Sequence, residues 1–236
     1  MRIGCTKFLN LIGIGHSPAP LTKLSKPELV EWLSLSKEEE SERKGPPGEF
    51  LKKLFVQGEL CELITVDDLE KSLGKSRVFY NQEFKLENKW MTGTPDIIVD
   101  DKFVVECKAP YIPYPTPGET IEFYKGQVRE NPSYYMKYWL QTAIYCYLMK
   151  NDAPYFYLVF YILAEYSCIR FERDPKVEEL VEEFVSITLP EYLNTEDKTS
   201  LLRPKVIELR KKLEKECFNN CKYILFKEIQ LINQRQ

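Results

Sequence analysis

The chain has 236 residues, of which 44% are hydrophobic and 29% are charged, and its net charge at pH 7 is −3. This length and balance predict a soluble globular chain with one sizeable core, and they exclude the disordered and fibrous classes. The negative net charge argues against a passive protein that coats DNA, because such proteins more often carry a basic excess.

The sequence has no apolar run long enough to span a bilayer, and its first 15 residues lack the pattern of a signal peptide. Seven cysteines are scattered along the chain, so their spacing does not suggest a disulfide framework. We therefore expect an intracellular protein, in the cytoplasm or nucleus of a host or virus-infected cell, that is neither secreted nor bound to a membrane. Cys217 and Cys221 are four residues apart, which predicts two buried thiols on one helix face rather than a metal site.

The first third of the chain predicts helices separated by loops. Residues 5–24 indicate a short helix, a break at Gly13 and Gly15 and a proline-containing turn. Residues 34–48 are rich in Glu and Lys and indicate an exposed helix end and loop. A further helix is predicted for Glu49 to Leu63, before a break at Gly74. Its apolar anchors are expected to be Phe50, Leu54, Cys61 and Ile64.

Strands follow, first in a group of three and then as a pair. The predicted ranges are 78–86, 94–99 and 102–108 for the group, and 155–163 and 167–172 for the pair. Asp100 and Asp101 predict a tight hairpin turn. A proline-rich loop is predicted for 109–118, and helices are predicted for 133–149, 176–192 and the tail from Arg203 onward. This order predicts an α/β fold with a mixed central sheet flanked by helices.

The residues that carry chemistry lie on the predicted hairpin. Asp96 comes at the start of one strand, and Glu106 and Lys108 come at the end of the next. Because side chains alternate along a strand, Glu106 and Lys108 share one side of the sheet while Cys107 points to the other. The hairpin brings Asp96 alongside them. The plain alternative is an ordinary hairpin with solvated charges at its edge.

Two carboxylates and an ammonium that converge at a strand end predict a metal site. Hard oxygen ligands suit Mg²⁺, for which Mn²⁺ is a substitute, and the backbone carbonyl of Cys107 is a candidate further ligand. Such a cation lowers the pKa of bound water, and Lys108 would position or activate that water. The predicted ligands are therefore Asp96, Glu106 and this carbonyl.

The predicted helix 133–149 carries Tyr138, Gln141 and Tyr145 on one face. This polar and aromatic stripe can lie beside the metal centre and orient a phosphate or water. Taken alone, Gln141 is more often a surface amide and Tyr145 a core aromatic residue.

Asp96, Glu106-x-Lys108 and Gln141-x-x-x-Tyr145 together resemble the lambda-exonuclease and YqaJ-like, RecB-related branch of the PD-(D/E)XK nucleases. The resemblance extends from about Cys5 to Leu193. It implies one nuclease domain over residues 1–193, of the restriction-endonuclease-like type. Residues 194–236 are then expected to form a helical C-terminal extension that packs on the same domain through an apolar stripe, Leu209, Leu213, Ile224 and Leu225.

The resemblance also implies roles for residues outside the hairpin. Gly58 to Glu62 is similar to the family's Gly-x-x-x-Glu helix, which makes Glu62 the acid that completes the metal site. Without the resemblance, Glu62 would be taken for an exposed helical acid. The opening pattern around Cys5-Thr6-Lys7 makes Lys7 the candidate for contact with a 5′-phosphate. Ile169 to Asp174 is similar to the family's strand that ends in Glu-Arg-Asp.

The activity that the resemblance implies is Mg²⁺-dependent hydrolysis of DNA, as a 5′ to 3′ exonuclease on duplex ends in recombination, replication or repair, in a viral or phage-like setting. It also implies a ring-shaped homotrimer and a single-strand annealing protein as partner. One alternative is an endonuclease of the same fold that acts on single-stranded or branched DNA or on RNA. A second alternative is a scaffold that binds nucleic acid without cutting it.

Overall fold

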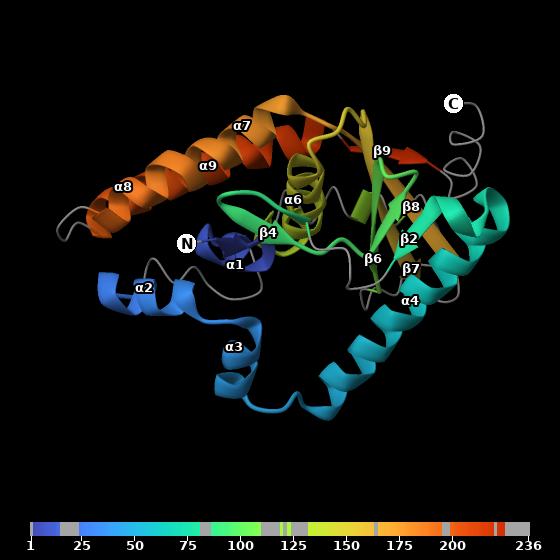
Figure 1. The fold of residues 1–236 in the computed structure, drawn as a ribbon, viewed down its shortest axis with the longest axis horizontal. Coiled ribbons are helices and arrows are strands. Elements are labelled where there is room, and N and C mark those ends of the chain that lie inside the picture. Colours follow the sequence, from blue (N-terminus) through green and yellow to red (C-terminus); the bar gives the residue numbers. More distant parts are fainter. Residues whose placement is uncertain are drawn as a thin grey trace.

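A six-stranded mixed β-sheet with helices on both faces forms the centre of the molecule (Figure 1). The computed structural model describes residues 2–14, 24–80, 86–109, 119, 122–123, 132–162, 165–194, 199–219 and 221–224. The sheet has the order β2-β5-β6-β7-β8-β9, with β6 and β7 parallel and all other neighbours antiparallel. A smaller sheet has the order β1-β4-β3. The predicted α/β class with a mixed sheet is confirmed.

The longest strands are β7 and β8, with eight residues each. The large sheet consists of β2 (Val78–Tyr80), β5 (Ile97–Val99), β6 (Phe103–Lys108), β7 (Tyr155–Ile162), β8 (Glu165–Glu172) and β9 (Cys221–Ile224). The small sheet consists of β1 (Ile3–Gly4), β4 (Met91–Gly93) and β3 (Leu86–Glu87).

The helices of the described residues include two long ones, α4 and α9. The first half of the chain contains α1 (Cys5–Leu11), α2 (Lys26–Ser34), α3 (Lys37–Lys44), α4 (Glu49–Leu73) and the 3-10 turn η2 (Lys75–Arg77). The second half contains α6 (Pro132–Met149), α7 (Pro175–Glu183), the π-helical turn η3 (Phe184–Thr188), α8 (Leu189–Asn194) and α9 (Thr199–Asn219). No helix of the described residues is both long and apolar enough to cross a membrane.

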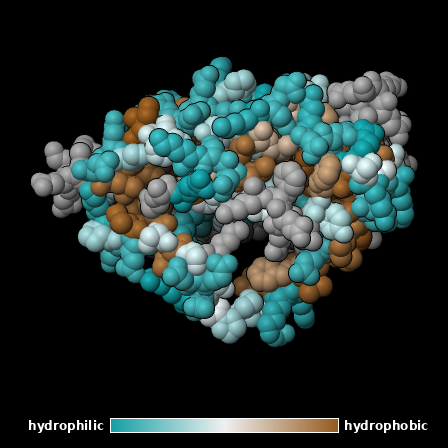
Figure 2. Space-filling view, viewed as in Figure 1, coloured by the Kyte–Doolittle hydropathy of each residue, from teal (hydrophilic) through white to brown (hydrophobic). Residues whose placement is uncertain are grey.

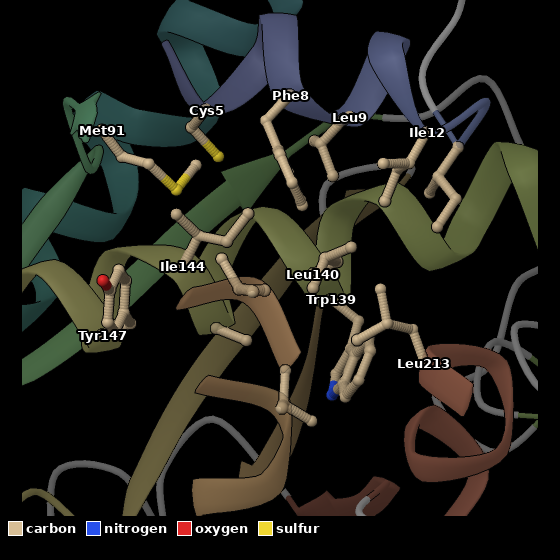
Figure 3. Close-up of a cluster of buried hydrophobic side chains, with 14 of the residues drawn as sticks. Cys5, Phe8, Leu9, Ile12, Met91, Trp139, Leu140, Ile144, Tyr147 and Leu213 are labelled. Carbon is tan, nitrogen blue, oxygen red and sulfur yellow. The ribbon is translucent and has the colours of Figure 1, made fainter. Parts of the chain in front are cut away.

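The sheet separates two hydrophobic cores because its side chains alternate between the faces. The larger core joins α1, α6, α7 and α9 to one face of the sheet through residues such as Leu158 and Phe171. Within it, Phe8 points from α1 toward α6, and Trp139 of α6 lies beside the side chain of Leu213 from α9 (Figure 3). The smaller core joins the last turns of α4 to the other face. Helix α6 and helix α4 therefore cover opposite sides of the strand that carries Glu106.

The hairpin between β5 and β6 has the predicted tight turn. Asp100 and Asp101 have φ angles of +57° and +53°, as a type I′ turn requires, and Lys102 N–H donates to Val99 O at 3.0 Å. The turn is anchored by Arg77, whose guanidinium contacts both oxygens of the Asp100 carboxylate at 2.5 and 2.6 Å. The register that follows places Ile97 opposite Val105, one residue from Asp96 and Glu106.

Helix α4 begins at Glu49 as predicted but continues ten residues beyond the predicted end, to Leu73 before Gly74. Phe50 is 63% exposed, so its prediction as a core anchor is wrong. The first turns of α4 stand away from the sheet (Figure 1), and hydrophobic side chains gather on the surface over this helix (Figure 2). Leu51, Phe55 and Val56 in these turns are exposed as well, so the helical periodicity there does not correspond to a buried face.

The predictions for residues 176–192 and 78–86 can also be compared with the structure. Helical structure from Pro175 to Asn194 agrees with the prediction for 176–192. The predicted strand 78–86 contains β2 at its start, whereas Leu86 at its end belongs to β3 of the small sheet. Residues 81–85 lie outside the described residues, as do Gly15 and most of the predicted loop 109–118.

The C-terminal tail departs from its helical prediction. Helix α9 ends at Asn219, and Cys221 lies in β9, which pairs with β8. Cys217 and Cys221 therefore do not share a helix face. Val206, Leu209, Leu213 and Cys217 are buried in the larger core, whereas Leu225 lies outside the described residues.

Candidate active site

The predicted charged pair lies at the end of β6, on the face that α6 covers. Glu106 is fully buried, and Lys108 Nζ donates to Glu106 Oε1 at 2.5 Å. Cys107 belongs to the core on the opposite face. The alternation expected from the sequence is thus present, and it brings an ammonium and a carboxylate of one strand into direct contact.

Asp96 joins this pair from the position just before the start of β5. Its Oδ2 accepts a hydrogen bond from the backbone N–H of Cys107 at 2.7 Å and lies 3.7 Å from Lys108 Nζ. The ammonium of Lys108 therefore lies between the carboxylates of Asp96 and Glu106. Burial opposes the charge of Lys108, but these two carboxylates together raise its pKa above its ordinary value.

The Glu106 carboxyl group is buried, only partly hydrogen-bonded and has a raised pKa. Its Oε1 accepts from Lys108 and from Gln141, whereas its Oε2 is buried and makes no hydrogen bond within the described residues. Burial, and after it the charge of Asp96, raises the pKa of Glu106 to about 8. A carboxylate with one oxygen unpaired in the interior is costly, so its retention here points to a function.

Glu62 lies on α4, which packs on the other face of the sheet. The side chain is half-buried, one turn before the core residues Thr65 and Val66. Burial, with a further contribution from Asp96, raises the pKa of Glu62 to about 7, and Lys108 partly opposes that rise. Glu62 therefore lies within electrostatic range of both residues and is more than an exposed helical acid.

Gln141 and Tyr145 lie on the face of α6 that meets β6, as their spacing predicted. Gln141 Nε2 donates to Glu106 Oε1 at 2.7 Å and to Tyr145 Oη at 2.9 Å. Burial, and after it the charge of Glu106, raises the pKa of the Tyr145 hydroxyl well above its ordinary value. The neutral phenol thus fixes the Gln141 amide, which in turn holds the Glu106 carboxylate. Tyr138 completes the stripe, with its ring centroid 5.7 Å from Lys108 Nζ.

Two residues near the site were not predicted from the sequence. Gly93, in β4, lies against the ring of Tyr145 so closely that a Cβ atom would come within 2.5 Å of it. Lys137, one turn before Gln141, is buried and lies 4.4 Å from the Tyr138 ring centroid. A signal for Lys137 exists in the sequence, because it is the single charged residue in Pro132–Met149. No comparable signal marks Gly93.

Lys7 is held by contacts with α2 and α3 and not by hydrogen bonds or ion pairs with this cluster. Its ammonium donates to the carbonyls of Leu35 at 2.6 Å and Trp32 at 3.0 Å, and it forms an ion pair with Glu40 at 2.8 Å. These contacts tie α1 to the end of α2 and to α3. Lys7 also lines a cavity of about 820 Å³ whose other walls include Thr94 and Tyr145.

The donor set of the cluster fits a hard divalent cation in its chemistry. Asp96, Glu106 and Glu62 offer carboxylate oxygens, and the buried Glu106 Oε2 has a lone pair that no described group satisfies. Among the described residues, however, no three His, Cys, Asp or Glu side chains are close enough together to hold a metal ion. Lys108 acts as counter-ion to Asp96 and Glu106 in this arrangement.

Comparison with known proteins does not identify a family for this chain. No protein-family model matches it, and no curated protein matches its sequence. Among solved structures, it is similar to the alkaline exonuclease LHK-Exo from Laribacter hongkongensis, with 13% identity and a TM-score of 0.47. It is also similar to LHK-Exo in complex with dAMP, with 15% identity and a TM-score of 0.46. Each comparison covers 91% of this chain and 94% of the other. A likeness this distant establishes neither a family nor an activity.

Proposed function

We propose that this chain is a metal-dependent DNA nuclease that hydrolyses phosphodiester bonds as a 5′ to 3′ exonuclease on duplex ends. The observation that carries the proposal is the Glu106 carboxylate. It is fully buried, one of its oxygens is held by Lys108 and Gln141, and the other has no hydrogen-bond partner among the described residues and feels the charge of Asp96. The polarity and the preference for duplex ends rest on the sequence resemblance alone.

Mg²⁺, or Mn²⁺ in its place, would be held by Asp96, Glu106, Glu62 and the backbone carbonyl of Cys107. When bound, such a cation polarises a phosphate oxygen and lowers the pKa of water that is bound to it. Two of these carboxylates, Asp96 and Glu106, already contact the Lys108 ammonium, and a divalent cation would offset the remaining negative charge. Burial is the largest cause of the raised pKa values of Glu62 and Glu106, and the negative charge of Asp96 adds to both.

The protein side chains have separate roles in the proposed reaction. Lys108 presents an ammonium at the open end of β6, where it can orient the attacking water and offset charge on the phosphate. Gln141 holds the Glu106 carboxylate in place, and the Tyr145 hydroxyl fixes the Gln141 amide. In the reaction, the water oxygen bonds to phosphorus and the bond from phosphorus to the leaving sugar oxygen breaks. The products are a phosphate monoester and a free hydroxyl group.

The test uses linear duplex DNA labelled at either the 5′ or the 3′ end, with Mg²⁺ or with EDTA. Release of the 5′ label as a mononucleotide, only with Mg²⁺, is the expected result. Lys108→Ala should abolish this release while DNA binding persists. Lys75→Ala is the matched control, because Lys75 is an exposed lysine of η2 that lies outside the site.

Other outcomes would change the proposal in defined ways. Cutting of single-stranded circles without loss of label from linear duplex would indicate an endonuclease with the same centre. Full activity of Lys108→Ala would overturn the assignment of the site. Absence of cleavage on both substrates would favour a scaffold that binds nucleic acid without cutting it.

A further inference from the structure

Helix α4 carries exposed apolar side chains on the side that faces away from the sheet. Val56, Leu60 and Leu63 are 62%, 46% and 57% exposed. Their spacing of four and three residues places them in one stripe along the helix. A helix at the surface of a globular protein normally directs polar residues outward. An outward apolar stripe is therefore a candidate surface for binding another protein surface.

The stripe is separate from the face by which α4 packs on the sheet. Leu69 is fully buried in the smaller core and comes nine residues after Leu60, which is about two and a half helical turns. The two side chains therefore point to opposite sides of α4. Glu62 comes seven residues before Leu69 and so lies on the sheet side. Helix α4 runs along the outer edge of the molecule (Figure 1), so a partner on the stripe would leave the proposed metal site open.

Charged side chains continue the stripe at both of its ends. Glu49 and Lys53 precede the three apolar residues, and Asp67 and Lys71 follow them, at the same intervals of three or four residues. All four charged residues are exposed. Lys53 and Asp67 are each seven residues from Leu60, and Glu49 and Lys71 are each eleven residues from it. Each cation on one side of Leu60 is thus matched by an acid at the same separation on the other side.

This pattern is complementary to itself in the antiparallel orientation. A two-fold axis beside Leu60 sets Lys53 of each copy opposite Asp67 of the other, and it sets Glu49 opposite Lys71. A parallel pair of helices would instead set Lys53 against Lys53 and Asp67 against Asp67, and repulsion between like charges disfavours that arrangement. A two-fold dimer requires one surface that is complementary to itself. The charges therefore select a second copy of α4, in antiparallel orientation, as the occupant of the stripe.

We propose that the outward stripe of α4 binds the same stripe of a second copy of this chain and forms a two-fold antiparallel dimer. The three apolar side chains of each copy leave water in the contact, and the flanking charges fix the orientation. One helix from each copy makes a small interface, so we expect dissociation in the micromolar range. The proposal is independent of the proposed nuclease activity, because none of the residues of the stripe belongs to the metal site.

The test is sedimentation equilibrium of the full chain at about 1 to 100 µM, the range in which a micromolar dimer forms. The wild type should change from monomer to dimer across this range. Leu60→Glu should weaken dimerisation by about 100-fold, because it brings two carboxylates together at the two-fold axis. Phe55→Glu is the matched control, since Phe55 is an exposed apolar residue of α4 that lies outside the stripe. It should leave the dimer intact.

Exchange of charges tests the antiparallel orientation. Lys53→Glu alone sets acid against acid at both ends of the dimer, and Asp67→Lys alone sets base against base. Each variant should dimerise about tenfold more weakly than the wild type. An equimolar mixture of the two variants should form a heterodimer with affinity close to that of the wild-type dimer, because every facing pair again has opposite charges.

Several results would overturn the proposal. The first is a wild type that stays monomeric over the whole range, and the second is a dimer or trimer whose affinity Leu60→Glu leaves unchanged. Weakened dimers of both charge variants without recovery in their mixture would overturn the antiparallel contact. Circular dichroism melting curves show whether each variant is folded, and Leu60→Gln takes the place of Leu60→Glu if the latter does not fold.

Discussion

Gly93 of β4 lies directly against the ring of Tyr145, with space for a hydrogen atom and not for a methyl group. A Cβ atom at residue 93 would lie 2.5 Å from Tyr145 Cε1 and 2.7 Å from Cδ1, with Leu148 Cδ1 at 3.3 Å. The ring that it supports ends in the hydroxyl that accepts from Gln141, and Gln141 donates to Glu106. The small sheet therefore acts on the proposed metal site through Tyr145 and Gln141.

Gly93→Ala is expected to lower both stability and activity. The added methyl group must displace the Tyr145 ring, and overpacking of this kind costs about 1–3 kcal/mol in the free energy of unfolding. The displaced hydroxyl would no longer hold the Gln141 amide, so kcat should fall more than KM rises. Thermal melts and steady-state cleavage of linear duplex DNA measure the two effects.

A double-mutant cycle tests whether Gly93→Ala acts by displacing the Tyr145 ring or by general damage to β4. In a Tyr145→Ala background the ring is absent, so Gly93→Ala should cost little there. An equal cost of Gly93→Ala in both backgrounds would show that the glycine acts through some other contact.

The stability of the metal-free protein should depend on pH through Glu106. Its pKa is about 8 in the folded state, compared with 4.5 as its ordinary value, so the folded state binds the proton more tightly than the unfolded state. This contribution is fully present below pH 4.5 and is lost as pH rises through 8. The slope is at most about 1.4 kcal/mol per pH unit for one proton.

Lys137 gives the stability a pH dependence of the opposite sign. Comparison of the wild type with Glu106→Gln isolates the contribution of Glu106, because Lys137 is present in both proteins. The pKa of Lys137 is lowered to about 7, so its contribution to stability grows as pH rises above 7. Urea unfolding in EDTA at pH 5 to 9 should show stability that falls with pH more steeply in the wild type than in Glu106→Gln. Glu38→Gln, on exposed α3, should follow the wild type. Parallel curves for the wild type and Glu106→Gln would contradict the raised pKa.

Mg²⁺ should stabilise the folded protein and should do so more strongly at pH 8 than at pH 6. The carboxylates must lose their protons to bind the ion, and Glu62 and Glu106 have raised pKa values of about 7 and about 8. At a free concentration 100 times Kd, the gain is about 2.7 kcal/mol. Thermal melts with Mg²⁺ or EDTA measure it, and Asp96→Asn should lose most of the gain. A shift of equal size in Asp96→Asn would place the ion elsewhere.

The parts of the site that could be predicted from the sequence are those that depend on local geometry. Strand alternation places Glu106 and Lys108 together, the two-residue turn places Asp96 beside them, and helical spacing aligns Gln141 with Tyr145. Each of these relationships spans few residues or one regular element. The structure has all of them.

The missed features depend on contacts between distant parts of the chain. Gly93 matters because it lies against the ring of Tyr145, which belongs to α6 and comes about 50 residues later in the sequence. Cys221 continues a helical pattern, yet pairing with β8 overrides that local preference. Phe50 has the periodicity of a core residue, but burial depends on whether another element packs over it, and that is not encoded in the periodicity of α4.

Asp101→Gly is expected to stabilise the hairpin that presents Asp96 to Glu106. Asp101 is exposed and has a φ angle of +53°, a conformation that costs a side-chain-bearing residue free energy and costs glycine little. A glycine at the second position of a type I′ turn should therefore raise the free energy of unfolding by about 0.5 kcal/mol. Asp101→Ala is the matched control, because it removes the carboxylate and keeps the Cβ atom, and it should give no gain. Asp100 stays unchanged in both variants, since its ion pair with Arg77 anchors the turn. Chemical denaturation measures the difference between the two variants, and equal stability of the two would show that the left-handed conformation carries no strain at this position.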